Sequence, residues 1–239
     1  MKNIKMKPLM FVALVSMMSA TVSAAMLLGD TVVINFTESA NTVGGNWNDF
    51  VTGLNLPFDE GILIPNLVRV SDGEETGVSL SLFGTEDSFG LGGRDETPVS
   101  SRAFPVTGTI PDAAQRRLTY HTANDNQFVF DGLDDSLTYN LSILSANTGG
   151  VRNAHEWIAN PGPGQFAISV NPNDGLVHTF SNLSTNGSGS IILQSSTTGS
   201  GIDAQHLNAM EITAIPEPGT LILLGLGLGA AFVFRRRGK

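Results

Sequence analysis

The sequence predicts an all-β domain in which two antiparallel sheets pack face to face as a sandwich. Three observations lead to this expectation. Short apolar segments alternate with clusters of Gly, Asn, Asp and Pro, apolar residues recur with a period of two, and helical periodicity is scarce. Dipeptides typical of tight turns separate the segments, as in Asp72-Gly73, Asp131-Gly132 and Asn186-Gly187. About nine or ten strands at this spacing are typical of a two-sheet sandwich.

The individual strands are predicted from alternating patterns. In Thr31 to Phe36, the side chains of Val32, Ile34 and Phe36 share one face, and Val78 to Phe83 alternates apolar residues with serines. Tyr139 to Ile143 has the same period. Further strands are expected at 63–70, 127–130, 165–170, 176–180, 190–194 and 207–213.

Residues 84–126 interrupt this pattern with a long, polar segment rich in Gly and Pro. We expect only one or two strands in it, and one helical turn opening at Asp112 with Gln115 in the capping position. A connection of this length in a compact domain is usually functional or disordered, and both alternatives stay open.

The first 24 residues have the three parts of a secretory signal peptide. Lys2, Lys5 and Lys7 precede an uncharged apolar run from Leu9 to Ala20, and small residues follow. A signal peptidase is expected to cut between Ala24 and Ala25. The alternative, an N-terminal membrane helix, is disfavoured because about 12 apolar residues are too few to span a bilayer that needs about 20.

The C-terminal segment, residues 214–239, combines three features in a fixed order. Pro216, Glu217 and Pro218 come first, an apolar stretch follows at about 219–234, and Arg235, Arg236 and Arg237 open a basic end at 235–239. The apolar stretch predicts a short transmembrane helix. The arginines are expected to stay on the cytoplasmic side, which places the large domain outside. A buried core helix is the alternative, and the arginine cluster argues against it.

This arrangement resembles the PEP-CTERM protein-sorting signal of Gram-negative bacteria that make extracellular polysaccharide. The resemblance implies that exosortase, a membrane protease, cleaves near Pro216–Pro218. The two prolines keep this peptide extended and out of the helix, as a protease requires. A plain tail anchor is the alternative.

The domain between the two ends, expected at residues 25–213, is strongly acidic. Residues 25–215 contain 6 arginines, no lysine and 21 acidic residues, which gives a formal net charge of −15. This charge argues against nucleic acid or an anionic membrane as a partner, and is compatible with neutral sugars or cations. The chain has no cysteine, so no disulfide can brace it.

Two segments of the middle domain resemble galactose-binding-like β-sandwich domains. They are Phe130 to Leu133, leading into Leu137 to Leu141, and the strand Leu207 to Ile212. The resemblance implies a jelly-roll-like fold that often binds carbohydrate and sometimes holds a structural calcium ion. The matching residues are expected to contribute core rather than chemistry.

Sequence motifs for catalysis are missing. There is no Gly-x-Ser-x-Gly elbow, and Ala159 stands where a zinc-protease motif begun by His155 and Glu156 would need its second histidine. A glycosidase needs only two carboxylates, and the sequence cannot single out a pair among so many. We therefore expect a protein that is not an enzyme.

Three aromatic residues are the candidates for stacking on a sugar: Trp47, Trp157 and Tyr120, each with polar neighbours. A Trp in a β-sandwich more often belongs to the core. Two acidic clusters could bind calcium through carboxylate oxygens, although solvated turns explain them equally well. The clusters are Asp72, Glu74 and Glu75, and Asp131, Asp134 and Asp135.

The sequence thus predicts an exported protein that is anchored in the inner membrane with its domain outside the cytoplasm, and is then processed to the cell surface or the extracellular space. There it is expected to associate with exopolysaccharide and to bind carbohydrate. A secreted polysaccharide hydrolase and a purely structural matrix component are the alternatives.

Overall fold

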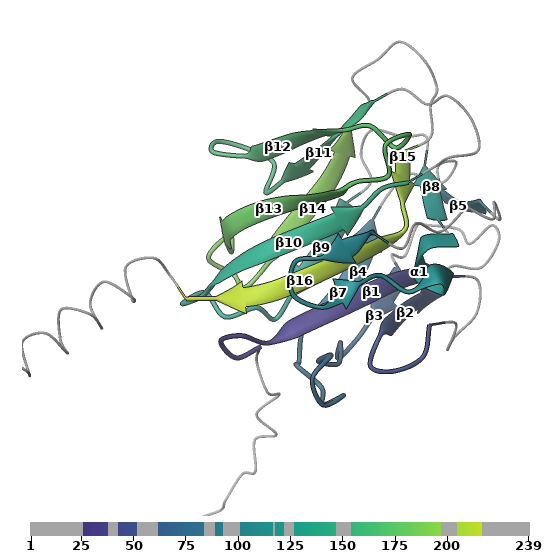
Figure 1. The fold of residues 1–239 in the computed structure, drawn as a ribbon. Helices are drawn as coiled ribbons and strands as arrows, with labels where there is room; N and C mark the ends of the chain where they lie inside the picture. The colour runs from purple at the N-terminus through teal and green to yellow at the C-terminus, as the bar shows by residue number, and fades with distance from the viewer. Residues whose placement is uncertain are drawn as a thin grey trace, which may run out of the picture.

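The structure is a computed structural model, and it describes residues 26–37, 43–51, 62–83, 89–92, 101–116, 118–121, 127–146, 154–196 and 205–216. Two large sheets pack face to face, which confirms the predicted β-sandwich (Figure 1). We call them sheet A and sheet B. Among the described residues, strands are far more numerous than expected, and one short helix accompanies them.

Sheet A has five strands in the order β13-β10-β16-β1-β2. Their bounds are β1 Thr31–Thr37, β2 Asn48–Val51, β10 Thr138–Leu144, β13 Val177–Ser184 and β16 Ala209–Ile215. All pairs in the sheet are antiparallel except β1 and β2, which run parallel with Ile34 opposite Asn48. The prediction of a purely antiparallel sandwich is therefore wrong at this edge, because the chain after Thr37 returns to re-enter the sheet in the same direction at Asn48.

Sheet B has six strands in the order β12-β11-β14-β9-β4-β3, all antiparallel. Their bounds are β3 Ile62–Ile64, β4 Ser79–Phe83, β9 Gln127–Asp131, β11 His155–Ala159, β12 Phe166–Val170 and β14 Ile191–Ser196. Strand β11 was not expected from the sequence.

The main core lies between the two sheets. Phe36 of β1 meets Phe128 of β9 edge to face, with ring centroids 5.5 Å apart, and Phe128 in turn packs on Trp157 of β11. Strands of sheet B alternate buried and partly exposed residues, as β9 does over its five positions. This is the pattern of a strand with only one face against the core.

The central strands of sheet A are buried on both faces. β1 is buried at all seven positions, and β16 at six of seven. The reason is a second cluster of apolar residues on the outer face of the sheet, which includes Val33, Leu144 and Ala209 from the sheet and Phe104 and Ile110 from residues 101–116.

Residues 101–116, part of the segment left open between function and disorder, are therefore a structural cover (Figure 1). The cover contains β6 Ala103–Phe104, β7 Gly108–Thr109 and α1 Asp112–Arg116. The helical turn expected at Asp112 is confirmed by α1. The described part of 84–126 also holds β5 Phe89–Gly92 and β8 Leu118–His121, which form a small sheet with β15 Gln205–Leu207 in the order β15-β8-β5.

The cover is hydrogen-bonded to sheet A through Glu211 of β16. This carboxylate is 2% exposed and accepts hydrogen bonds from the backbone amide of Val106 (3.2 Å) and from the amide and hydroxyl of Thr107 (2.8 and 2.6 Å). A second hydrogen bond to the cover comes from Asn208, whose Nδ2 donates to the carbonyl of Gln115 at 3.1 Å. Glu211 and Asn208 thus have a structural role, since the polar side chain of each finds its hydrogen-bond partners within the fold.

Candidate functional site

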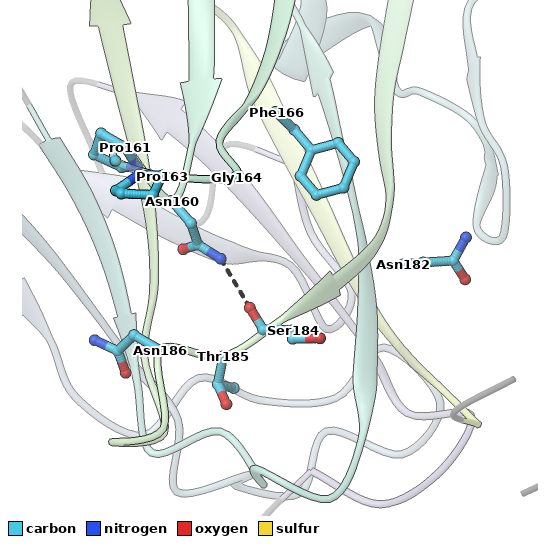
Figure 2. A pocket seen from close by; sticks show the side chains of 10 residues that line it. Asn160, Pro161, Pro163, Gly164, Phe166, Asn182, Ser184, Thr185 and Asn186 are labelled. Atoms are coloured by element: carbon cyan, nitrogen blue, oxygen red, sulfur yellow. Dashed lines mark hydrogen bonds between the residues drawn. The ribbon is translucent and has the colours of Figure 1, made fainter. Parts of the chain in front are cut away.

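A pocket of about 510 Å³ opens at one side of the sandwich, between the edge of sheet A and the edge of sheet B (Figure 2). One wall is the turn from β11 to β12 together with the start of β12. The other wall is the end of β13 and the turn that follows it. The lining residues are Asn160, Pro161, Gly162, Pro163, Gly164, Phe166, Asn182, Ser184, Thr185 and Asn186.

The first wall is stiff because of its composition. Pro161 and Pro163 fix two φ angles of the turn, and Gly162 and Gly164 take φ values of 135° and 85° that other residues rarely adopt. The backbone amide of Gly162 donates to the Oε1 of Gln165 at 3.3 Å, which closes the turn. A wall that is ordered before a ligand arrives loses little conformational entropy on binding.

Asn160 ties the two sheets together at the base of this turn. Its Nδ2 donates to the carbonyl oxygen of Ser184 in sheet A at 2.8 Å, as Figure 2 shows, and its Oδ1 accepts from the amide of Ile192 in sheet B at 3.0 Å. Its φ is 49°. Asn tolerates this left-handed conformation better than most residues, so the position suits the residue type.

The second wall is shaped by a bulge in β13. Asn140 of β10 lies opposite both Ser181 and Asn182, because the register shifts between the pairs Tyr139–Leu183 and Leu141–Phe180. The Oδ1 of Asn140 accepts from the amide of Asn182 at 3.1 Å, and Asn182 has a φ of 57°. Ser181 and Asn182 are consequently both exposed, which breaks the alternation along β13.

The turn after β13 completes this wall. The Oδ1 of Asn186 accepts from the amide of Ser188 at 2.9 Å, and Thr185 donates its hydroxyl to Asp135. In contrast, the side-chain amide of Asn182 and the Nδ2 of Asn186 have no hydrogen-bond partner within the part of the chain that the structure describes. These groups are available to a ligand.

The chemistry of the pocket is neutral and mixed. The ring of Phe166 is 50% exposed beside amide and hydroxyl groups, and none of the ten lining residues is charged. An exposed ring packs on the apolar face of a sugar, while amides and hydroxyls hydrogen-bond to its hydroxyl groups. The arrangement therefore fits a neutral, polyhydroxylated ligand, and offers no acid, base or nucleophile among its described residues except hydroxyls.

The structure distributes the three predicted aromatic candidates differently. Trp157 is fully buried in the main core, so its prediction as a sugar platform is wrong: its position on β11 faces sheet A. Trp47 is partly buried and packs on the second cluster, with its ring centroid 6.5 Å from that of Phe104. Tyr120 belongs to β8, opposite His206 of β15, and its side chain lies outside the described part. None of the three lines the pocket, and Phe166, which does, was not predicted.

The acidic clusters do not converge on a cation position. Asp72 pairs with Arg69 at 3.1 Å and accepts from the amide of Glu74. Asp134 accepts hydrogen bonds from the hydroxyl and the amide of Ser136, which lower the pKa of its carboxyl group. Within the described ranges, no group of three or more His, Cys, Asp or Glu residues could hold a metal ion. Each of these two carboxylates accepts hydrogen bonds within the turn to which it belongs.

The residues of the two termini are mostly outside the described part. This applies to the predicted signal peptide with Ala24 and Ala25, and to Glu217, Pro218 and the segments 219–234 and 235–239. Pro216 is described: it directly follows β16, and its carbonyl accepts a 3.4 Å hydrogen bond from the hydroxyl of Thr138. No helix among the described residues is long and apolar enough to cross a membrane.

Comparison with known families identifies the C-terminal segment. Residues 214–237 match the PEP-CTERM protein-sorting motif, so the chain carries this motif as predicted. The motif implies an exported protein that is anchored in the membrane at its C-terminus, processed by exosortase, and then located at the surface. The molecule is thus a β-sandwich with an exosortase sorting motif.

Other comparisons add little. A search of curated proteins gave no match. Among solved structures, the chain is similar to CBM35 from Cellvibrio japonicus Abf62, with 16% identity, coverage of 57% of this chain and 94% of that chain, and a TM-score of 0.28. A TM-score this low carries no argument about fold or ligand.

Proposed function

We propose that the exported domain is a non-catalytic carbohydrate-binding module that holds a neutral polysaccharide in the pocket between β12 and β13. The observation that carries the proposal is the half-exposed ring of Phe166 in a pocket lined by amides, hydroxyls and prolines without a charge. A protein with a net charge of −15 over residues 25–215 repels acidic polymers, so a neutral sugar is the ligand class that suits both the pocket and the surface around it.

A hydrolytic role at this pocket has no support from its lining. Both retaining and inverting glycosidases place two carboxyl groups across the bond that breaks. Asp135 lies behind the second wall, where it accepts hydrogen bonds from Thr185 and from the amide of Gly189 at 2.9 Å. It does not line the pocket, and so we propose binding rather than catalysis.

The proposal includes the route to the surface. Residues 1–24 serve as a signal peptide, a helix at about 219–234 holds the chain in the inner membrane, and exosortase cleaves near Pro216–Pro218. The exported domain, a sandwich of jelly-roll type, then reaches the exopolysaccharide. Intact-mass measurement of the membrane and medium fractions tests this route. A mature species ending near Pro216, lost when Pro216 and Pro218 are both replaced by Ala, is the expected result. A chain that stays in the membrane with Lys239 present would refute it.

The binding proposal is tested by calorimetric titration of the protein with neutral oligosaccharides prepared from the host exopolysaccharide. We expect Phe166→Ala to weaken binding about tenfold or more, which corresponds to about 1.4 kcal/mol and is the order expected for a lost aromatic platform. The matched control is Phe83→Ala on β4, whose ring is 49% exposed and does not line the pocket. Equal losses for both variants, or no binding by the unmodified protein, would contradict the proposal.

Two further features of the titration sharpen this test. Asn182→Ala is expected to weaken binding, whereas Asn182→Gly separates the loss of the amide from the backbone strain, because Gly accepts the φ of 57°. Binding is expected to be independent of ionic strength, since salt screens only charged partners. A strong salt dependence would indicate a charged ligand at another surface.

A further inference from the structure

Two adjacent leucines stand out at the start of the described domain. Leu27 is 62% exposed and Leu28 is 57% exposed, in a turn that precedes β1. The turn is well ordered by its own hydrogen bonds: the amide of Asp30 donates to the carbonyl of Leu27 at 2.9 Å, and the amide of Leu27 donates to the Oδ2 of Asp30 at 2.7 Å. Met26, just before them, is buried. The fold therefore presents this apolar pair to the outside.

The leucine turn lies beside the exit of the C-terminal segment. The amide of Gly29 donates to the carbonyl of Ala214 at 2.9 Å, and the amide of Ala214 donates to the carbonyl of Asp30 at 3.0 Å. Ala214 is the first residue of the sorting motif, and β16 ends one residue later at Ile215. Both ends of the described domain thus leave from the same end of sheet A (Figure 1).

The length of the connection limits how far this end can be from the bilayer. In the sequence, four residues, 216–219, separate Ile215 from the apolar run that begins at Thr220. Even a fully extended chain spans at most about 18 Å between Ile215 and Thr220, at up to about 3.6 Å per residue. While the anchor is in place, the leucine turn is therefore held close to the membrane surface.

The charges around the turn are compatible with such a contact. Arg69 pairs with Asp30 of the leucine turn at 3.5 Å and with Asp72 at 3.1 Å, which places one positive charge beside these two carboxylates. The acidic turn before β10 is at the same end, because Thr138, the first residue of β10, pairs with Ile215. This turn contains Asp134 and Asp135, so lipids without net charge suit the surface better than anionic ones.

We infer that Leu27 and Leu28 are a membrane-contact site that inserts into the interface of the bilayer for as long as the C-terminal anchor is attached. The inference rests on the membrane anchoring that the sorting motif implies, and it is independent of any carbohydrate binding. Paired apolar side chains on a rigid turn gain from leaving water at the boundary of headgroups and acyl chains. The contact orients the domain on the membrane with this end of sheet A toward the lipid.

The absence of cysteine from the sequence makes a site-specific label straightforward. The exported chain, residues 25–239 with the C-terminal anchor and without the signal peptide, carries an environment-sensitive fluorophore at Leu28→Cys and is reconstituted in phosphatidylcholine vesicles. The control is Leu176→Cys, which has the same 57% exposure. Leu176 precedes β13 at the far end of sheet A, since Val177 pairs with Leu144, which pairs with Ala209, the first residue of β16.

For the label at Leu28, we expect an emission maximum shifted to shorter wavelength and a loss of intensity when a quencher is carried on the lipid. For the label at Leu176, we expect neither change. Water-like emission from both labels would overturn the inference. The measurement is repeated in lipid nanodiscs that hold one copy each, where the Leu28 signal is expected to persist. Its loss there would show that a second copy of the chain, and not lipid, covers the leucines.

Discussion

Within the described part, the outer face of sheet A is covered and the outer face of sheet B is open. Two glutamates show the difference. Glu211 of β16 points away from the main core, yet it is almost fully buried because residues 101–116 cover it. Glu156 of β11 also points away from the core, and it is partly exposed because, within the described part, no element covers sheet B. Residues 101–116 belong to the long segment 84–126, for which the sequence left function and disorder open, and they form this cover. The candidate site opens at the edges of the sheets, beside a short turn.

The largest effect is expected for the buried glutamate. Glu211→Ala removes three hydrogen bonds and leaves the amides of Val106 and Thr107 without an acceptor, which costs about 3 kcal/mol of folding free energy. Glu156→Ala on the open face is expected to cost less than about 0.5 kcal/mol. Urea denaturation of both variants measures the difference. Similar losses would mean that the cover does not protect Glu211 as described.

A second contrast compares two aromatic residues that are neither fully buried nor fully exposed. Trp47→Ala removes the ring that packs on Phe104 and the second cluster, and should cost about 2 kcal/mol, below the range for fully buried rings. Phe166→Ala removes a ring that faces the pocket, and should cost less than about 1 kcal/mol while it weakens ligand binding. The same denaturation experiment, with ligand titration, separates the two roles. If Trp47→Ala lost ligand binding while Phe166→Ala kept its affinity, the roles assigned to the two rings would be reversed.

At the junction of the two sheets, Asn160 gives an effect of similar size to that of Trp47. Asn160→Ala loses the bonds to Ser184 and Ile192 and strains the backbone at its φ of 49°, for a total of about 2 kcal/mol. Asn160→Gly loses the same bonds without the strain and should cost about 1 kcal/mol. Thermal or urea unfolding distinguishes them. An equal loss of folding free energy in both variants would show that the left-handed backbone conformation at position 160 causes no strain in Asn160→Ala.

A further effect depends on pH and concerns the turn that supports the second wall of the pocket. The hydroxyl of Tyr139 donates to the carbonyl of Asp134 at 3.1 Å and accepts from its amide at 2.8 Å. Burial raises the pKa of Tyr139 to about 12, with the hydrogen bond to the backbone of Asp134 acting in the opposite direction and the carboxylates of Asp134 and Asp135 adding to the rise.

Because this pKa lies above the ordinary value of 10 for an unfolded chain, the folded state favours the protonated phenol. The contribution to stability is complete below pH 10 and is lost as the pH rises from 10 to 12. Urea midpoints measured across this range should fall for the unmodified protein, and less steeply for Tyr139→Phe. Parallel curves for the two proteins would contradict the assignment.

Local sequence patterns were informative wherever one strand has one buried face. Strands β4, β9 and β14, whose burial alternates, were predicted close to their observed bounds, because alternation reports which face meets the core. The residues of the sandwich resemblance are core, as expected: Leu207, Met210 and Ile212 are fully buried. Asn208 and Glu211 of the same segment differ in character, since their polar side chains hydrogen-bond to the cover.

Strand β11 shows where local patterns failed. The pair His155-Glu156 drew attention as the beginning of a metal motif, although His155, Trp157 and Ala159 alternate with partly exposed Glu156 and Ile158 as a strand should. The turn after it, Asn160-Pro161-Gly162-Pro163-Gly164, was a visible signal of a rigid hairpin. Phe166 at the end of such a turn could have been considered alongside the tryptophans.

By itself, the sequence determined the sorting motif, the charge of the domain and the sandwich class, because each is written in composition, in the order of short segments, or in periodicity along one strand. The tertiary structure decided which aromatic ring is exposed, that residues 101–116 cover sheet A, and that β12 and β13 meet to form a pocket. These depend on contacts between residues far apart in the chain. The side chains of Trp157 and Phe166 belong to one hairpin, and only the position of sheet A relative to sheet B places one inside and the other outside.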